Sequence, residues 1–284
     1  MSLFRSARSA ARPEAHSEAK VLAEKPGPWI DLALTLPLFL AYHCGVVFLK
    51  IQNATDVLTP ALVELAEGNR AVYLLITASI GVVFAGIFGW LGRGEAFRTS
   101  KFVQVILEGT LYAVVMRVAG SYVVSNLFAP AHAAAASGLG ALADPASPAS
   151  GSLFGFITDD KRFVGAVTSM GAGFYEELAF RAVLFGLGAK LLVWFFARQE
   201  LQMVKPGGAR LSLRALVIMV AWMLASAAIF SGMHYVGALS DKFLWTSFVY
   251  RMVIGVVLTL IYLTRGFSTA VWAHALYDLW VLVF

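Results

Sequence analysis

Charged residues are scarce in this chain. Only 14% of its 284 residues are Asp, Glu, Lys or Arg, against roughly 25% in an average soluble domain, and 59% are hydrophobic. The mean hydropathy is +0.75. This composition is typical of a polytopic membrane protein. We therefore expect the lipid bilayer as a partner. Because the formal net charge is only +5, we expect no nucleic acid.

Cysteine is almost absent as well. Cys44 is the single cysteine, which excludes an intrachain disulfide and any metal site built from cysteines. The residues just before it, Ala41-Tyr42-His43, lack the small residue that a lipoprotein cleavage site needs there, so Cys44 is interpreted as a structural thiol. The first apolar run also lacks a small-x-small cleavage site, and we expect it to remain as a membrane span.

The chain has neither internal repeats nor the alternating segments of ~10 residues that form transmembrane strands. Its apolar runs instead reach or approach the ~20 residues that cross a bilayer as a helix. These runs lie near 30–49, 71–91, 102–129, 163–197, 213–235, 243–264 and 267–284. The predicted fold is therefore all-α, a polytopic integral membrane helix bundle of about seven transmembrane helices. A break near Gly186 and Gly188 would give eight, but we favour one tilted helix over 163–197.

Two segments are polar or low in complexity. Residues 1–28 end in Pro-Gly-Pro and are predicted to form a disordered cytoplasmic tail, and residues 130–162 a low-complexity extracytoplasmic loop. Between and after them lie the N-terminal transmembrane helices, 29–129, and a C-terminal group of transmembrane helices, 163–284.

The basic residues are distributed asymmetrically along the chain. The tail and alternate loops contain Arg5, Arg8, Arg12, Lys20, Lys25, Arg93, Arg98, Lys101, Arg198, Lys205, Arg210, Arg214 and Arg265. The intervening segments contain only Lys50, Arg70, Lys161, Arg162 and Lys242. The positive-inside rule therefore predicts a multi-pass protein of the cell (inner) membrane with its N-terminus in the cytoplasm and its C-terminus outside.

Three ionisable residues lie inside the fourth apolar run, in the stretch GFYEELAFRAVLF. Burying such side chains at membrane depth is costly unless they are paired or hydrated, so they indicate function. At 100° per residue, Glu177 and Arg181 share one helical face and are predicted to form a structural ion pair, whereas Glu176 points about a quarter-turn away. Glu176 is thus expected to lack a cation of its own and to be able to take and return protons.

Two histidines and an aspartate lie at membrane depth in later runs. His234 ends the fifth run, and His274 shares a helical face with Asp278 in the last. Together with Glu176 they are the groups needed for a general base that activates water and for stabilisation of an oxyanion. The same residues could also supply zinc ligands.

Three motifs occur in order on separate apolar runs: E-E-x-x-x-R at 176–181, F-x-x-x-H at 230–234 and H-x-x-x-D at 274–278. They resemble the motifs of the CAAX-processing and bacteriocin-immunity (CPBP) family of intramembrane proteases. The resemblance covers roughly 163–284 and the first three spans have no such likeness. It implies a CPBP-like catalytic region and a hydrolase, a glutamate-dependent intramembrane endopeptidase.

The resemblance also implies roles for the residues of these motifs. Glu176 would activate water with the help of His234, and His274 with Asp278 would line the oxyanion site. Glu177, Arg181 and Phe230 would support the site structurally. The family's last motif often ends in Asn. Because an ionised Asp cannot donate a hydrogen bond to an oxyanion, Asp278 is expected to orient His274 or to stay protonated.

Other functions remain open at this stage. A zinc-dependent CAAX-type protease would use Glu176, His234 and His274 as ligands, but no H-E-x-x-H motif places two histidines on one helix, so we favour a metal-free mechanism without a cofactor. Immunity or scaffold proteins share the motifs, and a transporter would also keep charges in its core. We favour the enzyme because the set of motif residues is complete.

The predicted topology indicates a substrate class. Since the fourth and fifth runs place Glu176 and His234 between mid-membrane and the outer surface, we expect a membrane-anchored or exported protein as the substrate. The cut would fall in a membrane-embedded or juxtamembrane peptide, such as a C-terminal sorting or anchor segment. Elsewhere, Glu108 and Arg117 are expected to contact other helices or to help line the cavity, and the Arg251 side chain is expected to extend to a helix end.

Overall fold

The computed structural model describes residues 25–49, 58–133, 161–199, 211–236 and 241–284, and all regular elements within these ranges are helices. Six helical segments of this part of the chain are long and apolar enough to cross a membrane. They are α2 (Pro28–Leu49), α4 (Arg70–Leu91), α5 (Thr99–Ala133), the segment Lys161–Ala197, α9 (Leu213–Met233) and α10 (Trp245–Arg265). A short helix, α3 (Leu58–Leu65), lies between α2 and α4.

The last helix, α11 (Phe267–Val283), is shorter but equally apolar. Its 17 residues extend ~25 Å at 1.5 Å per residue, close to the thickness of a bilayer core. Eight of these 17 residues are buried, because α11 packs against α7, α5, α10 and α2 at the centre of the molecule. Together with α11, the described residues form seven apolar helical segments, the number that the hydropathy pattern predicts, and the all-α membrane fold is confirmed.

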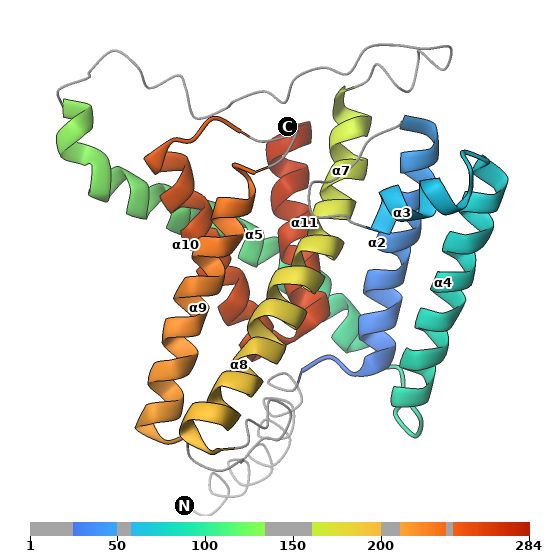
Figure 1. Ribbon diagram of the computed structural model, residues 1–284, viewed down its shortest axis with the longest axis horizontal. Coiled ribbons are helices and arrows are strands. Elements are labelled where there is room, and N and C mark those ends of the chain that lie inside the picture. Colours follow the sequence, from blue (N-terminus) through green and yellow to red (C-terminus); the bar gives the residue numbers. More distant parts are fainter. Residues whose placement is uncertain (1–24, 50–57, 134–160, 200–210, 237–240) are drawn as a thin grey trace, which may run out of the picture.

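The fourth apolar run forms a single helical segment, as we favoured, and does not break at Gly186 or Gly188 (yellow to gold in Figure 1). Its hydrogen-bonding pattern nevertheless changes along its length. The segment begins as α7 (Lys161–Glu176), continues as a π-helix, η1 (Glu177–Leu187), and ends as α8 (Gly188–Leu192) and a second π-helical turn, η2 (Val193–Ala197).

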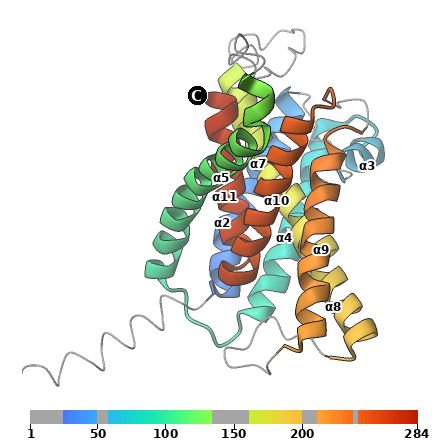
Figure 2. The ribbon, with the colours of Figure 1, turned by 90° about the vertical axis from the view of Figure 1, so that its left-hand side faces the viewer.

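The helices form two neighbouring groups around α11. On one side α2 packs between α4 and α7, and on the other α9 pairs with α10 (Figure 1). The long helix α5 crosses the bundle obliquely beside α11 and α10 (Figure 2). The start of α2 and the C-terminus lie at opposite ends of the bundle, as an odd number of crossings requires (Figure 1).

The outward faces of these helices are apolar, with Leu75 and Val82 of α4 68% and 71% exposed, which suits contact with lipid. Ionisable residues inside the bundle instead find partners. Glu108 of α5 accepts two hydrogen bonds from Arg265 of α10, and Arg117 lies over the Trp280 ring at 5.0 Å, so the prediction that both contact other helices is confirmed.

The predicted tail and extracytoplasmic loop fall mostly outside the described residues, which omit 1–24 and 134–160. At their edges, α2 begins at Pro28, α5 continues to Ala133 and α7 begins at Lys161.

Candidate active site

The site is built on a close contact between α7 and α11. Gly173 of α7 lies against the backbone of α11, where a Cβ atom would come within 2.9 Å of both the Ala275 nitrogen and the Val271 oxygen. Gly171 lies on the side of α7 that faces α2, against the ring of Tyr42. Small residues thus allow α7 to approach both neighbours closely, as the Gly-Ala-Gly sequence before the two glutamates predicts.

This contact gives a first testable prediction. Replacing Gly173 with Ala is expected to destabilise the protein by about 1–3 kcal/mol, because the added methyl group meets backbone atoms that cannot rotate away. The measurement is thermal unfolding of the purified protein in detergent. Gly86→Ala is the matched control, since a Cβ there meets no atom within 4 Å. Equal unfolding temperatures for the two variants would contradict this account of the α7–α11 contact.

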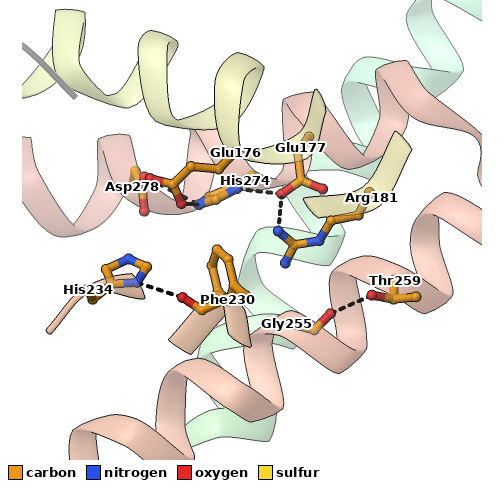
Figure 3. A network of polar contacts seen from close by, with 9 residues as sticks. All are labelled: Glu176, Glu177, Arg181, Phe230, His234, Gly255, Thr259, His274 and Asp278. Atoms are coloured by element: carbon orange, nitrogen blue, oxygen red, sulfur yellow. Dashed lines mark hydrogen bonds and ion pairs between the residues drawn. The ribbon is translucent and has the colours of Figure 1, made fainter. Parts of the chain in front are cut away.

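His274 of α11 lies at the centre of a buried group of carboxylates (Figure 3). Its Nδ1 is 2.6 Å from Glu177 Oε1, within hydrogen-bond distance. Its Nε2 faces two further carboxylates, 3.7 Å from Glu176 Oε2 and 3.5 Å from Asp278 Oδ2. The i, i+4 relation of His274 and Asp278 therefore brings them together as predicted, and one imidazole connects three acids.

The position of Glu176 differs from the sequence-based expectation. We expected this carboxylate to have no cationic group beside it, but His274 Nε2 lies 3.7 Å away. The expectation considered only the face of one helix, whereas Gly173 brings α11 so close that its imidazole lies between both glutamates. Glu176 is 6% exposed, so it remains a buried carboxylate, although not an isolated one.

The ion pair between Glu177 and Arg181 is confirmed, with Arg181 Nη1 3.1 Å from Glu177 Oε1. Both side chains are almost fully buried, at 0% and 1% exposure. The Arg181 guanidinium also lies over the Phe230 ring, 4.2 Å from its centroid, a favourable contact for a buried cation. Phe230 of α9 in turn packs edge-on against the ring of His274, so the predicted supporting residues surround the histidine.

The π-helix η1 begins at Glu177, directly after Glu176. Hydrogen bonds of the i→i+5 type widen a helix, are rare, and often occur at functional sites. The change in helix type falls between the two glutamates, because Glu176 is the last residue of α7 and Glu177 is the first residue of η1. Trp222 of α9 stabilises the segment from outside by donating a hydrogen bond to the Leu184 carbonyl at 2.9 Å.

His234 follows the last residue of α9 and lies across from Glu176 and Asp278 (Figure 3). Its Nδ1 donates to the Phe230 carbonyl at 3.0 Å, which fixes the tautomer that leaves Nε2 as an acceptor. His234 is close enough to Glu176 and His274 for their charges to interact. The structure thus brings together residues from all three motifs.

Glu176, His234 and His274 are the candidate zinc ligands of the alternative mechanism. Within the described ranges no group of three His, Cys, Asp or Glu side chains is arranged so that it could hold a metal ion. His274 Nδ1 is engaged by Glu177, so its Nε2, 3.7 Å from Glu176 Oε2, is the nitrogen that faces the other carboxylates.

Arg251 of α10 is a site neighbour that sequence reasoning missed. We expected its side chain to reach a helix end, but its guanidinium donates to the Tyr235 hydroxyl at 3.1 Å and pairs with Asp241 at 2.5 Å. Its charge also acts on His234 and Asp278. The only sequence signal was an arginine eight residues after the start of the apolar run 243–264, and its partners lie before α10 begins.

The arrangement can perform acid–base chemistry. Glu176 provides a buried carboxylate, and a protonated His274, whose Nδ1 donates to Glu177, can present its second proton at Nε2. A base and a proton donor on adjacent helices, with the donor's orientation fixed by a third group, are the components for activating water and stabilising an anion.

Comparison with known proteins agrees with this chemistry. Residues 158–280 match the family model described as type II CAAX prenyl endopeptidase Rce1-like. The match contains all three motifs and excludes α2, α4 and α5. Neither the curated proteins nor the solved structures include a match to the chain.

Proposed function

We propose that the chain is an intramembrane protease in which Glu176 activates the attacking water, since residues 158–280 match the family model of type II CAAX prenyl endopeptidases, Rce1-like. The observation that carries the proposal is the position of His274. Its two nitrogens face Glu177 on one side and Glu176 with Asp278 on the other.

In this proposal Glu176 takes a proton from water as the water attacks the scissile carbonyl. The 3.7 Å separation between Glu176 Oε2 and His274 Nε2 supports this role, because a distance above 3.5 Å between polar atoms is suited to a bridging water. Glu176 then returns the proton to the leaving amine, so that water is consumed and no group is left on the enzyme. His234, across from Glu176, assists as a second acceptor.

His274 stabilises the oxyanion of the tetrahedral intermediate. Glu177 accepts the hydrogen bond from Nδ1, and in the protonated imidazolium the second proton, on Nε2, is directed toward the reacting group as a donor. Asp278 lies 3.5 Å from the same nitrogen. We assign Asp278 to orienting the imidazole, since an ionised carboxylate only accepts hydrogen bonds. Glu177, Arg181 and Phe230 hold His274 in place.

The proposed reaction uses no metal or other cofactor. Two observations support this: within the described residues no three His, Cys, Asp or Glu side chains are grouped as metal ligands, and Glu176 can supply the base that a metal-bound hydroxide would otherwise provide.

We further propose that the substrate approaches from outside the cell. His234 follows the end of α9 at the same end of the bundle as the C-terminus (Figure 1). The positive-inside asymmetry places that end outside. The substrate would then be a membrane-embedded or juxtamembrane peptide of an exported or membrane-anchored protein, with its C-terminal sorting or anchor segment as the favoured cleavage region.

The test is to map new C-termini of membrane and exported proteins in cells with and without this protein. We expect termini that depend on the protein and lie within or just outside a membrane segment, on its extracytoplasmic side. Cuts confined to cytoplasmic tails would contradict the proposed orientation. The absence of any dependent terminus would contradict protease function and favour a scaffold or a transport path.

A further inference from the structure

A buried hydrogen-bonded chain joins the N-terminal helices to the catalytic segment. His43 of α2 is fully buried, with Nδ1 2.5 Å from the Tyr73 hydroxyl of α4 and Nε2 2.5 Å from the Tyr175 hydroxyl of α7. A neutral imidazole has one donor and one acceptor nitrogen. His43 therefore donates to one tyrosine and accepts from the other, and both of its nitrogens are used.

Tyr175 connects this chain of hydrogen bonds to the candidate active site. Tyr175 directly precedes Glu176 and lies in the last turn of α7 before η1 begins at Glu177. Its ring is buried in an aromatic cluster with Phe39, Tyr42 and Phe174, and its hydroxyl extends to His43. The rotation of α7 at the two glutamates is thus fixed from the α2 side by a polar contact, opposite the close contact with α11.

The same helix, α2, also holds α11. Asp31 Oδ1 accepts a hydrogen bond from the Ser268 backbone nitrogen in the first turn of α11, at 3.3 Å. The Leu34 carbonyl accepts one from the Trp272 indole at 3.1 Å. The helix α2 is therefore bonded both to the segment carrying Glu176 and to the helix carrying His274, although it lies outside the region 158–280 that matches the family.

From these contacts we propose that His43, acting through Tyr175, is a positioning residue that sets the direction of Glu176 toward His274. The N-terminal spans, to which neither the motifs nor the family match assigns a role, would thereby form part of the catalytic scaffold. The inference rests on the proposed protease function, because it predicts a change in the rate of cleavage. It adds His43 to the residues on which catalysis depends, although His43 does not touch the substrate.

Breaking the hydrogen bonds of His43 is expected to lower kcat more than it changes KM. Replacing His43 with Leu leaves the buried Tyr175 hydroxyl without its partner, and the ring must shift to find another. A displacement of about 1 Å at reacting groups can lower a rate by about 100-fold. We therefore expect kcat to fall roughly 10- to 100-fold while KM, which reflects substrate binding elsewhere, changes by less than about twofold.

The experiment uses the full-length protein in detergent, with rates expressed per molecule of folded, monodisperse protein. The variants are His43→Leu, His43→Gln, Tyr175→Phe and the double variant His43→Leu/Tyr175→Phe. Gln retains a donor and an acceptor and is expected to recover most of kcat, and the double variant leaves no unpaired hydroxyl at Tyr175. Tyr122→Phe is the matched control, because Tyr122 is 69% exposed and lies on α5, a helix that contributes no residue to this hydrogen-bonded chain.

The double variant separates positioning from stability. A positioning role predicts that it regains the part of the unfolding temperature that His43→Leu loses at Tyr175, while the bond to Tyr73 stays broken and kcat stays low. If His43→Leu has normal kcat per folded molecule, or if the double variant recovers both quantities, the inference is overturned and the chain only stabilises the fold. Failure of Gln to improve on Leu would likewise contradict a role for the hydrogen bonds.

Hydrogen exchange supplies a readout that does not depend on activity. We expect Tyr175→Phe to raise amide exchange over Glu177–Leu187, with Leu213–Met233 and the Tyr122→Phe control unchanged. Unchanged exchange over Glu177–Leu187 overturns the inference even if the wild type cleaves nothing. If exchange rises as expected while Glu176→Gln cleaves as well as wild type, the proposed protease mechanism fails and the positioning of Glu176 by His43 stands.

Discussion

Replacing Glu176 with Gln is expected to lower kcat by about 10²- to 10⁴-fold while the protein accumulates in the membrane at its normal level. Gln keeps the shape of the side chain and removes the base, and general-base catalysis contributes rate factors of this size. Glu176 is not part of the buried ion pair, so its loss leaves the contact between Glu177 and Arg181 intact. The measurement is cleavage of a processed substrate with enzyme levels matched.

Glu177→Gln is the matched variant for this result. Glu177 accepts from His274 Nδ1 and pairs with Arg181, so a neutral amide there is expected to lower abundance first. It should also lower kcat, since His274 loses the carboxylate that orients it. If Glu177 had only a structural role, as the sequence alone suggests, kcat per folded molecule would not change. Normal processing by Glu176→Gln would contradict the glutamate mechanism.

Replacing Arg181 with Met is expected to lower the free energy of unfolding by about 3–5 kcal/mol, the largest stability effect that we predict. The change removes one partner of an ion pair in which both side chains are buried, and it leaves a carboxylate in an apolar environment. It also removes the cation that lies 4.2 Å from the centre of the Phe230 ring. Denaturant or thermal unfolding of the purified protein in detergent measures the loss.

Arg93→Met is the control for this prediction. Arg93 is an exposed arginine in the turn between α4 and α5, so its charge remains in solvent and its removal should change stability by less than about 0.5 kcal/mol. If Arg181→Met were no more destabilising than Arg93→Met, Arg181 would not carry the structural role given to it here.

The fold was largely predictable from hydropathy because a bilayer allows few solutions. Every backbone polar group must be paired inside the apolar core, so long apolar runs become helices, and their number and order follow from the sequence. The run 163–197 was correctly predicted as one helix because its glycines are too few to end it within an otherwise apolar segment. The last helix was found as well, although it is shorter than the others.

The site was only partly predictable, because periodicity describes one helix at a time. The pairs Glu177 with Arg181 and His274 with Asp278 lie four residues apart, so a helical repeat suffices to predict them. The bond from His274 to Glu177 spans 97 positions, and its geometry depends on the contact at Gly173. A rotation of 100° per residue also ignores the π-helix that begins at Glu177.

His43 shows the same limit. A single histidine in an apolar run carries no signal for its partners, which lie 30 and 132 positions away on α4 and α7. The three motifs all lie in the C-terminal spans, so the sequence alone gives no role to the first three spans. In three dimensions one of these spans, α2, packs against both α7, which carries Glu176, and α11, which carries His274 and Asp278.

The central claim is that a water molecule activated by Glu176 cuts a peptide bond. Its most direct test is cleavage of a processed substrate by purified wild-type protein in water enriched in ¹⁸O, followed by mass spectrometry of the new C-terminus. We predict one ¹⁸O atom in the new carboxylate, formed by wild type and not by Glu176→Gln. A product whose new C-terminus carries another nucleophile, or equal ¹⁸O incorporation by Glu176→Gln, would contradict the account.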